Sequence, residues 1–170
     1  PLHRDLGDKT LEAWVKLDTL DQRNGGVLSV QTLDGNTFDA IVYAEQQPRR
    51  WMAGSDFFHR TRPFQGIAEK KVNEIVHVAI TYADNGTMIA YRDGIPYGTG
   101  YRIDNPVAFR AGKAQVLFGL RHGPPVNNRL FSGTIVRARL YSRSLTAEEI
   151  ANSAGLPTVS PEEIRTQLPA

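Results

Sequence analysis

The sequence has no cysteine among its 170 residues. This absence excludes disulfide bonds, thiol catalysis, haem attachment through a Cys-x-x-Cys-His motif and cysteine-bearing zinc sites within the chain. Long apolar runs are missing as well, since no segment approaches the roughly 20 consecutive apolar residues that span a bilayer. We therefore expect no insertion into a membrane.

A large net charge is also lacking. Lysine and arginine number 20 and aspartate and glutamate 18, which leaves a net charge of +2. Because this balance is close to neutral, it does not favour a polyanionic partner, and we expect no binding to nucleic acid. A hydrophobic content of 41% in 170 residues is enough for one core, so we predict one domain over residues 1–155.

The sequence motifs of common enzymes are absent. Glycosidases need two nearby carboxyl groups, yet no run such as Glu-x-Asp-x-x-Glu occurs, because Glu12 is followed by AWVKL, Glu45 by QQPRR and Glu69 by KKVNE. There is no Gly-x-Ser-x-Gly elbow, His-Glu-x-x-His pair or phosphate-binding glycine loop. The four histidines are scattered without metal-ligand spacing. We therefore predict a protein that is not an enzyme, with no catalytic residues and no cofactor.

Two clusters of aspartate and asparagine residues raise the question whether the chain binds calcium. Asp34, Asn36 and Asp39 lie close together in the sequence, as do Asp84 and Asn85. Calcium takes carboxylate and carbonyl oxygens from loops of this kind, but the same residues are also common in ordinary turns. We assign no metal ligand, and a melting temperature unchanged by calcium or chelator would remove the calcium hypothesis.

The clearest indication of the fold is residues 76–97. Val76, Val78, Ile80 and Tyr82 alternate with smaller or polar residues, which is typical of a strand with one buried face. Asn85-Gly86 then favours a tight turn, and residues 87–92 form a second β-rich run. A further Asp-Gly pair and residues 95–97 follow, so we predict an antiparallel meander of three strands. It needs a second layer to bury its apolar face.

Similar patterns predict further strands along the chain, followed by helices. The expected strands are residues 10–17, 27–32, 37–44, 49–54, 115–120 and 130–142. Thr146 and Glu149 stand at capping-box spacing, which predicts a helix from residue 147 to about 155. Ser160 and Glu163 repeat that spacing and predict a second short helix over residues 161–168. We interpret residues 156–170 as a helical linker to a further domain.

Two loops, at residues 51–64 and 121–128, and one tyrosine carry the residues that we expect to contact a ligand. Periodicity disappears over residues 55–69, where aromatic and basic side chains alternate, and a polar loop with two prolines follows residue 120. Long irregular segments are often functional. Such side chains could stack on sugar rings or bind an acidic group, but they could equally cap the edge of a sandwich. The candidates are Trp51, Phe57, Phe58, His59, Arg60, Arg62, Tyr97, Arg121, His122, Asn127 and Asn128.

Several segments resemble a known family. TLEAWVKL, the 76–97 hairpin with its Asp-Gly turn, FGLRH and GTIVRARLYSRSLTAEEI follow the order found in laminin-G-like domains of the concanavalin A-like lectin/glucanase superfamily. This resemblance implies an all-β fold, an antiparallel two-sheet β-sandwich or jelly roll with a short C-terminal helix.

A more particular likeness concerns the origin of the chain. RRWMAGSDFFHRT, FDAIVYAE and YRDGIPYG resemble the laminin-G-like module of large planctomycete-type proteins, which also carry a cytochrome-c-like haem domain and domains of unknown function. This implies a multidomain parent exported to the periplasm, cell surface or extracellular space. The first residues, PLHRDLGDKT, have neither an initiator methionine nor the apolar core of a signal peptide, and we expect a piece of a longer protein.

Three functional hypotheses follow, because this fold does not imply one activity. The first is a non-catalytic module that recognises carbohydrate through the two loops at residues 51–64 and 121–128. The second is a docking domain that binds neighbouring domains of the same parent chain, without a sugar ligand. The third is a glycoside hydrolase, which would need paired acids that the sequence does not show.

Overall fold

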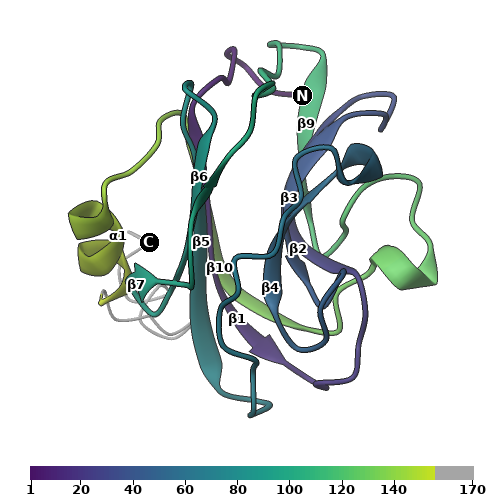
Figure 1. Ribbon diagram of the computed structural model, residues 1–170. Coiled ribbons are helices and arrows are strands. Elements are labelled where there is room, and N and C mark those ends of the chain that lie inside the picture. Colours follow the sequence, from purple (N-terminus) through teal and green to yellow (C-terminus); the bar gives the residue numbers. More distant parts are fainter. Residues whose placement is uncertain (156–170) are drawn as a thin grey trace, which may run out of the picture.

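The computed structural model describes residues 1–155, which form two antiparallel sheets stacked face to face (Figure 1). One sheet has six strands in the order β10-β1-β5-β6-β7, with β8 paired to β6, and the other has four in the order β4-β3-β2-β9. The all-β sandwich with a C-terminal helix is therefore confirmed. The strands are β1 (Lys9–Leu17), β2 (Gly25–Thr32), β3 (Phe38–Tyr43), β4 (Trp51–Ser55), β5 (Ile75–Tyr82), β6 (Thr87–Arg92), β7 (Ile95–Pro96), β8 (Tyr101–Arg102), β9 (Ala114–Phe118) and β10 (Gly133–Tyr141).

The core lies between the sheets and follows from the period-two patterns. On β1, Leu11, Val15 and Leu17 are buried in the main core cluster, and Val78 and Ile80 of β5 belong to the same cluster. Burying each large aliphatic side chain contributes roughly 1.5–3 kcal/mol. The alternation therefore decides which face of each strand turns toward the other sheet.

The helix α1 (Ala147–Ala154) lies on the outer side of the six-stranded sheet (Figure 1). Its predicted capping box is confirmed: the Glu149 amide donates to Thr146 Oγ1, and the Thr146 amide donates to the Glu149 carboxylate. Leu145 and Ile150 pack with Ala79 against the sheet. Within residues 1–155, no helix has the length and apolar character needed to cross a membrane. The second predicted helix and the linker fall outside the described residues.

The outer side of the four-stranded sheet is covered by residues 119–132, which include the short helix η2 (Asn127–Arg129) (Figure 1). Ser29 Oγ donates to the Leu120 carbonyl at 2.9 Å, and the Gly123 amide donates to Gln31 Oε1 at 2.7 Å. A Cβ at Gly26 would lie 2.2 Å from the Arg121 backbone, so this close approach requires glycine. The second loop expected to bind a ligand thereby lies over this sheet.

Most predicted strand bounds lie within two residues of the observed ones, and two larger differences remain. Strand β10 begins at Gly133 rather than at residue 130, because Leu130 forms bridges with Gly26 and Leu120 that close the covering loop. Strand β8 was not predicted, since two residues carry no period. The irregular character of residues 55–69 is confirmed, with the single turn of η1 (Asp56–Phe58) as its one helical element.

Candidate functional site

A groove of about 430 Å³ lies on the outer side of the four-stranded sheet. Three segments form it: the hairpin between β2 and β3, the end of β4 with η1, and the covering loop after β9. We call it the outer groove. Its lining residues are Asp34, Gly35, Asn36, Phe38, Glu45, Ser55, Asp56, Phe57, Phe58, Arg121, His122, Gly123, Pro124 and Arg129.

Two phenylalanines form the aromatic rim of the outer groove. Phe57 is 84% exposed and Phe58 49% exposed. Their φ angles are +48° and +58°, in the left-handed region that residues other than glycine rarely adopt. Such a backbone costs about 1–3 kcal/mol per residue and persists only where the surroundings hold it. The structure therefore stabilises a conformation that keeps two large apolar rings in solvent.

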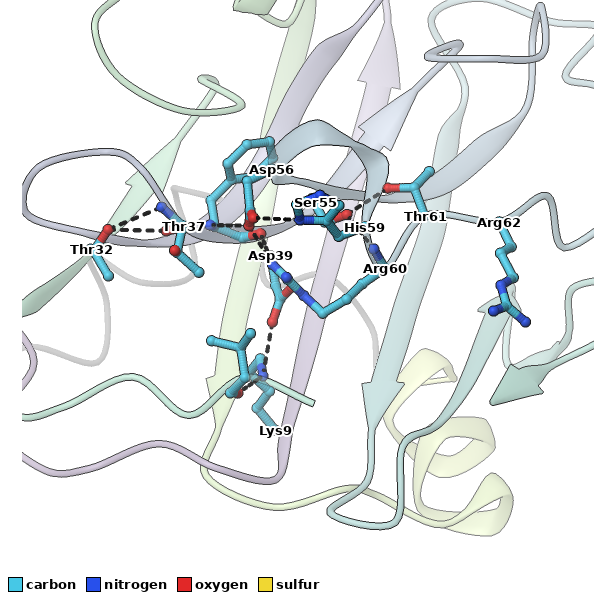
Figure 2. A network of polar contacts seen from close by, with 12 residues as sticks. Lys9, Thr32, Thr37, Asp39, Ser55, Asp56, His59, Arg60, Thr61 and Arg62 are labelled. Atoms are coloured by element: carbon cyan, nitrogen blue, oxygen red, sulfur yellow. Dashed lines mark hydrogen bonds and ion pairs between the residues drawn. The ribbon is translucent and has the colours of Figure 1, made fainter. Parts of the chain in front are cut away.

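Arg60 supplies much of that support from inside the sandwich (Figure 2). Its guanidinium donates to Asp56 Oδ1 at 2.6 Å, to Asp39 Oδ1 at 2.9 Å and to the Phe38 carbonyl at 2.9 Å. Its amide donates to Ser55 Oγ at 2.9 Å. Because these contacts bury Arg60, this candidate ligand residue braces the rim instead of facing the groove.

The floor of the groove contains a stacked pair of rings. His122 lies on Phe38 with the ring centroids 4.4 Å apart and the planes 14° apart. Burial lowers the pKa of His122, and the charge of Arg129 lowers it further. The imidazole is therefore neutral at pH 7 and can present an uncharged face and a polar nitrogen to a ligand.

An ion pair beside these rings provides polar groups. Arg121 Nη1 lies 2.6 Å from Glu45 Oε1, and the Glu45 side chain is only 1% exposed. Burial raises the pKa of Glu45, and the Arg121 charge opposes that rise. Glu45 Oε2 and Arg121 Nε have no hydrogen-bond partner within the part of the chain that the structure describes. The ion pair thus leaves one acceptor and one donor unused.

Trp51 and Tyr97 lie in the core and not in the outer groove. Trp51 points inward from β4, where its Nε1 donates to Glu69 Oε1 at 2.7 Å. Tyr97 donates its hydroxyl to the Ile67 carbonyl at 2.5 Å, and burial raises its pKa to about 12. Both rings fill the space between the sheets, so neither is available there to stack on a ligand.

The remaining candidates are exposed but lie outside the groove lining. Arg62 donates to the Arg102 carbonyl at 3.2 Å and points away from the Asp39 network (Figure 2). Asn127 and Asn128 line a separate shallow pocket. His59 is exposed beside Phe57, with ring centroids 5.7 Å apart. The outer groove therefore brings together four of the eleven candidates, namely Phe57, Phe58, Arg121 and His122.

Among the groove residues that were not candidates in the sequence, Phe38, Glu45 and Arg129 make the side-chain contacts described above. Residues 38, 40 and 42 are apolar, and so are 41 and 43 on the other face of the strand. That double pattern indicates a strand covered on both sides, and it could have revealed that a loop lies over the sheet. Glu45 and Arg129 left no such signal, because only the folded chain brings them to the groove.

The calcium hypothesis for the first acidic cluster is not supported by its geometry. Asp34 accepts hydrogen bonds from Thr32 and Asn36 in the hairpin, whereas Asp39 points between the sheets toward Lys9 (Figure 2). Their oxygens therefore do not converge. Over residues 1–155, no group of three or more histidine, aspartate or glutamate side chains is placed to hold a metal ion.

Comparison with known proteins gives a match to one protein family. A family model described as "Concanavalin A-like lectin/glucanases superfamily" matches residues 2–151. No curated protein sequence matches the chain significantly.

Several solved structures share the fold at low sequence identity. A heptameric SAP-like pentraxin from Limulus polyphemus is 15% identical with a TM-score of 0.62, covering 89% of this chain and 71% of the pentraxin chain. The CBM40 domain of Ruminococcus gnavus IT-sialidase is 14% identical with a TM-score of 0.62, over 88% of this chain and 84% of that one. Trypanosoma rangeli sialidase is 20% identical with a TM-score of 0.59, over 87% of this chain but only 22% of the sialidase.

Proposed function

Because the chain belongs to the concanavalin A-like lectin/glucanase superfamily, we propose that it is a non-catalytic binding module whose ligand is a carbohydrate held in the outer groove. The observation that carries this proposal is the pair of exposed rings, Phe57 and Phe58, at the rim of a groove that polar side chains also line. The fold alone does not select a ligand.

The chemistry of the groove fits a sugar. A pyranose ring has apolar C–H faces and a periphery of hydroxyl groups, so it combines stacking on aromatic side chains with hydrogen bonds around its edge. Phe57 and Phe58 provide the aromatic surface. Asp34 and Asn36, which line the groove and are exposed, provide polar groups for the hydroxyl groups of the sugar. The CBM40 domain of similar fold was solved bound to α2,3-sialyllactose, which supports a sugar as the ligand class.

The carboxyl groups of the groove favour binding over catalysis. A glycosidase uses one carboxyl group as an acid and a second as nucleophile or base. Here Glu45 is buried against Arg121, and Asp56 is held by Arg60 at 2.6 Å. Glu45 and Asp56 therefore each have a cationic partner that holds them in place. Asp34, the third carboxyl group of the groove, has no such partner but accepts hydrogen bonds from Thr32 and Asn36 within its own hairpin.

A glycan array and pull-downs on insoluble polysaccharides test the proposal. We expect the described domain to bind at least one glycan class, and a Phe57→Ala/Phe58→Ala variant to bind about tenfold more weakly or worse, since each ring contributes about 0.5–1.5 kcal/mol. Phe118→Ala is the matched control, because Phe118 is 62% exposed on β9 and does not line the groove. Empty arrays and pull-downs, or equal weakening by the control, would overturn the assignment. Release of reducing sugar from a bound glycan would contradict the non-catalytic role.

The wider context is also a proposal. The resemblance of several segments to modules of large exported proteins supports a place in a longer chain, with residues 156–170 leading to a further domain. Co-purification of the module with separately expressed neighbouring domains would support the docking alternative, provided that the Phe57→Ala/Phe58→Ala variant loses the interaction.

A further inference from the structure

The short helix η2 lies between the outer groove and a shallow surface pocket of about 550 Å³ (green turn at the right of Figure 1). We call this second site the η2 pocket; it is formed by the loop before β2 and by η2 with the residues that follow it. Arg129 lines the groove, whereas Asn127 and Asn128 of the same turn line the η2 pocket. Because a 3₁₀ helix rises about 2 Å per residue, the boundary between the two sites is one turn about 6 Å long. One extended ligand can therefore contact both sites.

Paired hydrogen bonds fix one wall of the η2 pocket. The Gln22 side chain donates to the Ser132 carbonyl at 2.7 Å and accepts from the Ser132 amide at 2.8 Å. It also donates to the Thr19 carbonyl at 3.1 Å. A Cβ at Gly25 would lie 2.8 Å from Gln22 Oε1 and 3.0 Å from Phe131 Cα, so this close packing requires glycine. The wall is therefore formed before a ligand arrives, which lowers the entropic cost of binding.

Arg129 holds η2 in place from the side of the groove. Its Nη1 donates to the carbonyls of Gly123 and Pro124 at 3.1 and 3.0 Å, and its own carbonyl accepts from the Arg121 amide at 2.9 Å. Gly123, Pro124 and Arg121 all line the outer groove. The groove and the η2 pocket therefore belong to one hydrogen-bonded framework.

The accessible side chains of the η2 pocket have the chemistry of a sugar site. Asn127 and Asn128 are exposed, and each amide offers both a donor group and an acceptor oxygen to hydroxyl groups. Arg23, which is also exposed, provides further donors. Leu130 is 46% exposed and adds an apolar surface for the C–H face of a ring. The pocket can therefore contact both the edge and the face of a sugar unit.

We propose that the η2 pocket is a second sugar subsite, and that the ligand is a chain of several sugar units that occupies the outer groove and crosses η2. This inference rests on the carbohydrate proposal and specifies its ligand class as a linear glycan bound along its length, rather than a single sugar. Once the groove holds one part of the chain, contact with the η2 pocket is intramolecular and adds affinity. Binding should therefore strengthen with chain length until both sites are filled.

A length series tests this inference. The probes are linear β-linked oligosaccharides of glucose, xylose and N-acetylglucosamine, each in lengths of about one to eight units, titrated by calorimetry. We expect at least one series to bind, with the longest chains binding at least about tenfold more tightly than the disaccharide. In nuclear magnetic resonance spectra of ¹⁵N-labelled protein, every binding length should shift the backbone amide signals of Phe57 and Phe58. Only the longer chains should shift the side-chain amide signals of Asn127 and Asn128.

Variants separate the second subsite from the groove. Asn127→Ala/Asn128→Ala should weaken binding of the longest chains about tenfold, the usual effect of losing one or two hydrogen bonds, and should leave the disaccharide unchanged. The start of η2 has no side-chain cap, so these substitutions remove no capping hydrogen bond. Asn152→Ala is the matched control, because Asn152 is exposed on α1, on the outer side of the other sheet, and it should leave all lengths unchanged.

The outcomes distinguish this inference from the carbohydrate proposal on which it rests. If a series binds but its affinity does not depend on length, or if Asn127→Ala/Asn128→Ala binds the longest chains as tightly as the unchanged protein, only the second subsite is overturned. If no series binds at any length, both proposals fail. Equal weakening of the longest chains by Asn152→Ala would also overturn the second subsite.

Discussion

Replacing Asp39 by asparagine should destabilise the fold strongly. The Asp39 side chain is 1% exposed and lies between Lys9 at 3.0 Å and Arg60 at 2.9 Å (Figure 2). Arg60 keeps Asp56 as a partner, but Lys9, whose side chain is 2% exposed, would have no anion left. Leaving a buried charge uncompensated typically costs about 3–5 kcal/mol. Since domains are stable by only about 5–15 kcal/mol, Asp39→Asn should remove a large part of the free energy of unfolding.

Urea denaturation followed by far-ultraviolet circular dichroism measures this loss. If the slope of the free energy of unfolding against urea concentration is unchanged, a shift in the midpoint concentration reports the change in that free energy directly. In thermal melts, the same loss corresponds to a decrease of about 6–20 °C for a chain of this length. The matched control is Asp21→Asn, because Asp21 pairs with Arg49 at 3.1 Å while both side chains are largely in solvent. Exposed pairs contribute about 0–1 kcal/mol.

A double variant identifies the cause of the loss. Lys9→Met removes the uncompensated charge and keeps the length of the side chain, so Asp39→Asn/Lys9→Met should be more stable than Asp39→Asn alone by at least about 1 kcal/mol. The reasoning is refuted if Asp39→Asn costs less than about 1 kcal/mol, if Asp21→Asn costs as much, or if the second substitution brings no recovery.

Three further predictions concern α1 and the groove. Thr146→Ala removes the helix cap and should lower the free energy of unfolding by about 1 kcal/mol in urea titrations, whereas no change would contradict the capping role. The pKa of Glu149 is lowered to about 2 by hydrogen bonds from Arg143 and the Thr146 amide. Its stabilisation is therefore complete above pH 4.5 and is lost as the pH falls through 2, and Glu149→Gln should lack this component in pH-dependent melts. The pKa of His122 is lowered in the folded chain. As the pH falls, the unfolded chain therefore takes up this proton first, near pH 6.5, and the free energy of unfolding should decrease below that pH. A nuclear magnetic resonance titration that placed the pKa of His122 above 6.5 would contradict this.

Local patterns in the sequence were sufficient for most of the secondary structure. The alternation in β1 and β5, the Asn85-Gly86 turn and the capping box at Thr146 each depend on residues a few positions apart. Backbone geometry links such neighbours directly, which is why their strands and helix could be predicted within a few residues. The resemblance to laminin-G-like domains then implied that these elements form two sheets, which the structure shows.

Local sequence patterns did not predict which side chains form the candidate site. Phe57 and Trp51 are both aromatic residues near one loop, but one is 84% exposed and the other is in the core. Trp51 lies on the inward face of β4, whereas Phe57 has the left-handed backbone of η1. Neither feature can be predicted from the local sequence. Contacts such as Glu45 with Arg121, 76 positions apart, exist only after the covering loop has folded across the sheet.

What the sequence determined by itself was therefore most of the strands, the turns that reverse them, the capped helix and the absence of thiol chemistry. The tertiary structure decided which candidate side chains reach solvent, and that four of them share a groove. The physical reason is that strand periodicity records only which residues share a face. Which face is buried, and what covers it, depends on packing between segments that are distant along the chain.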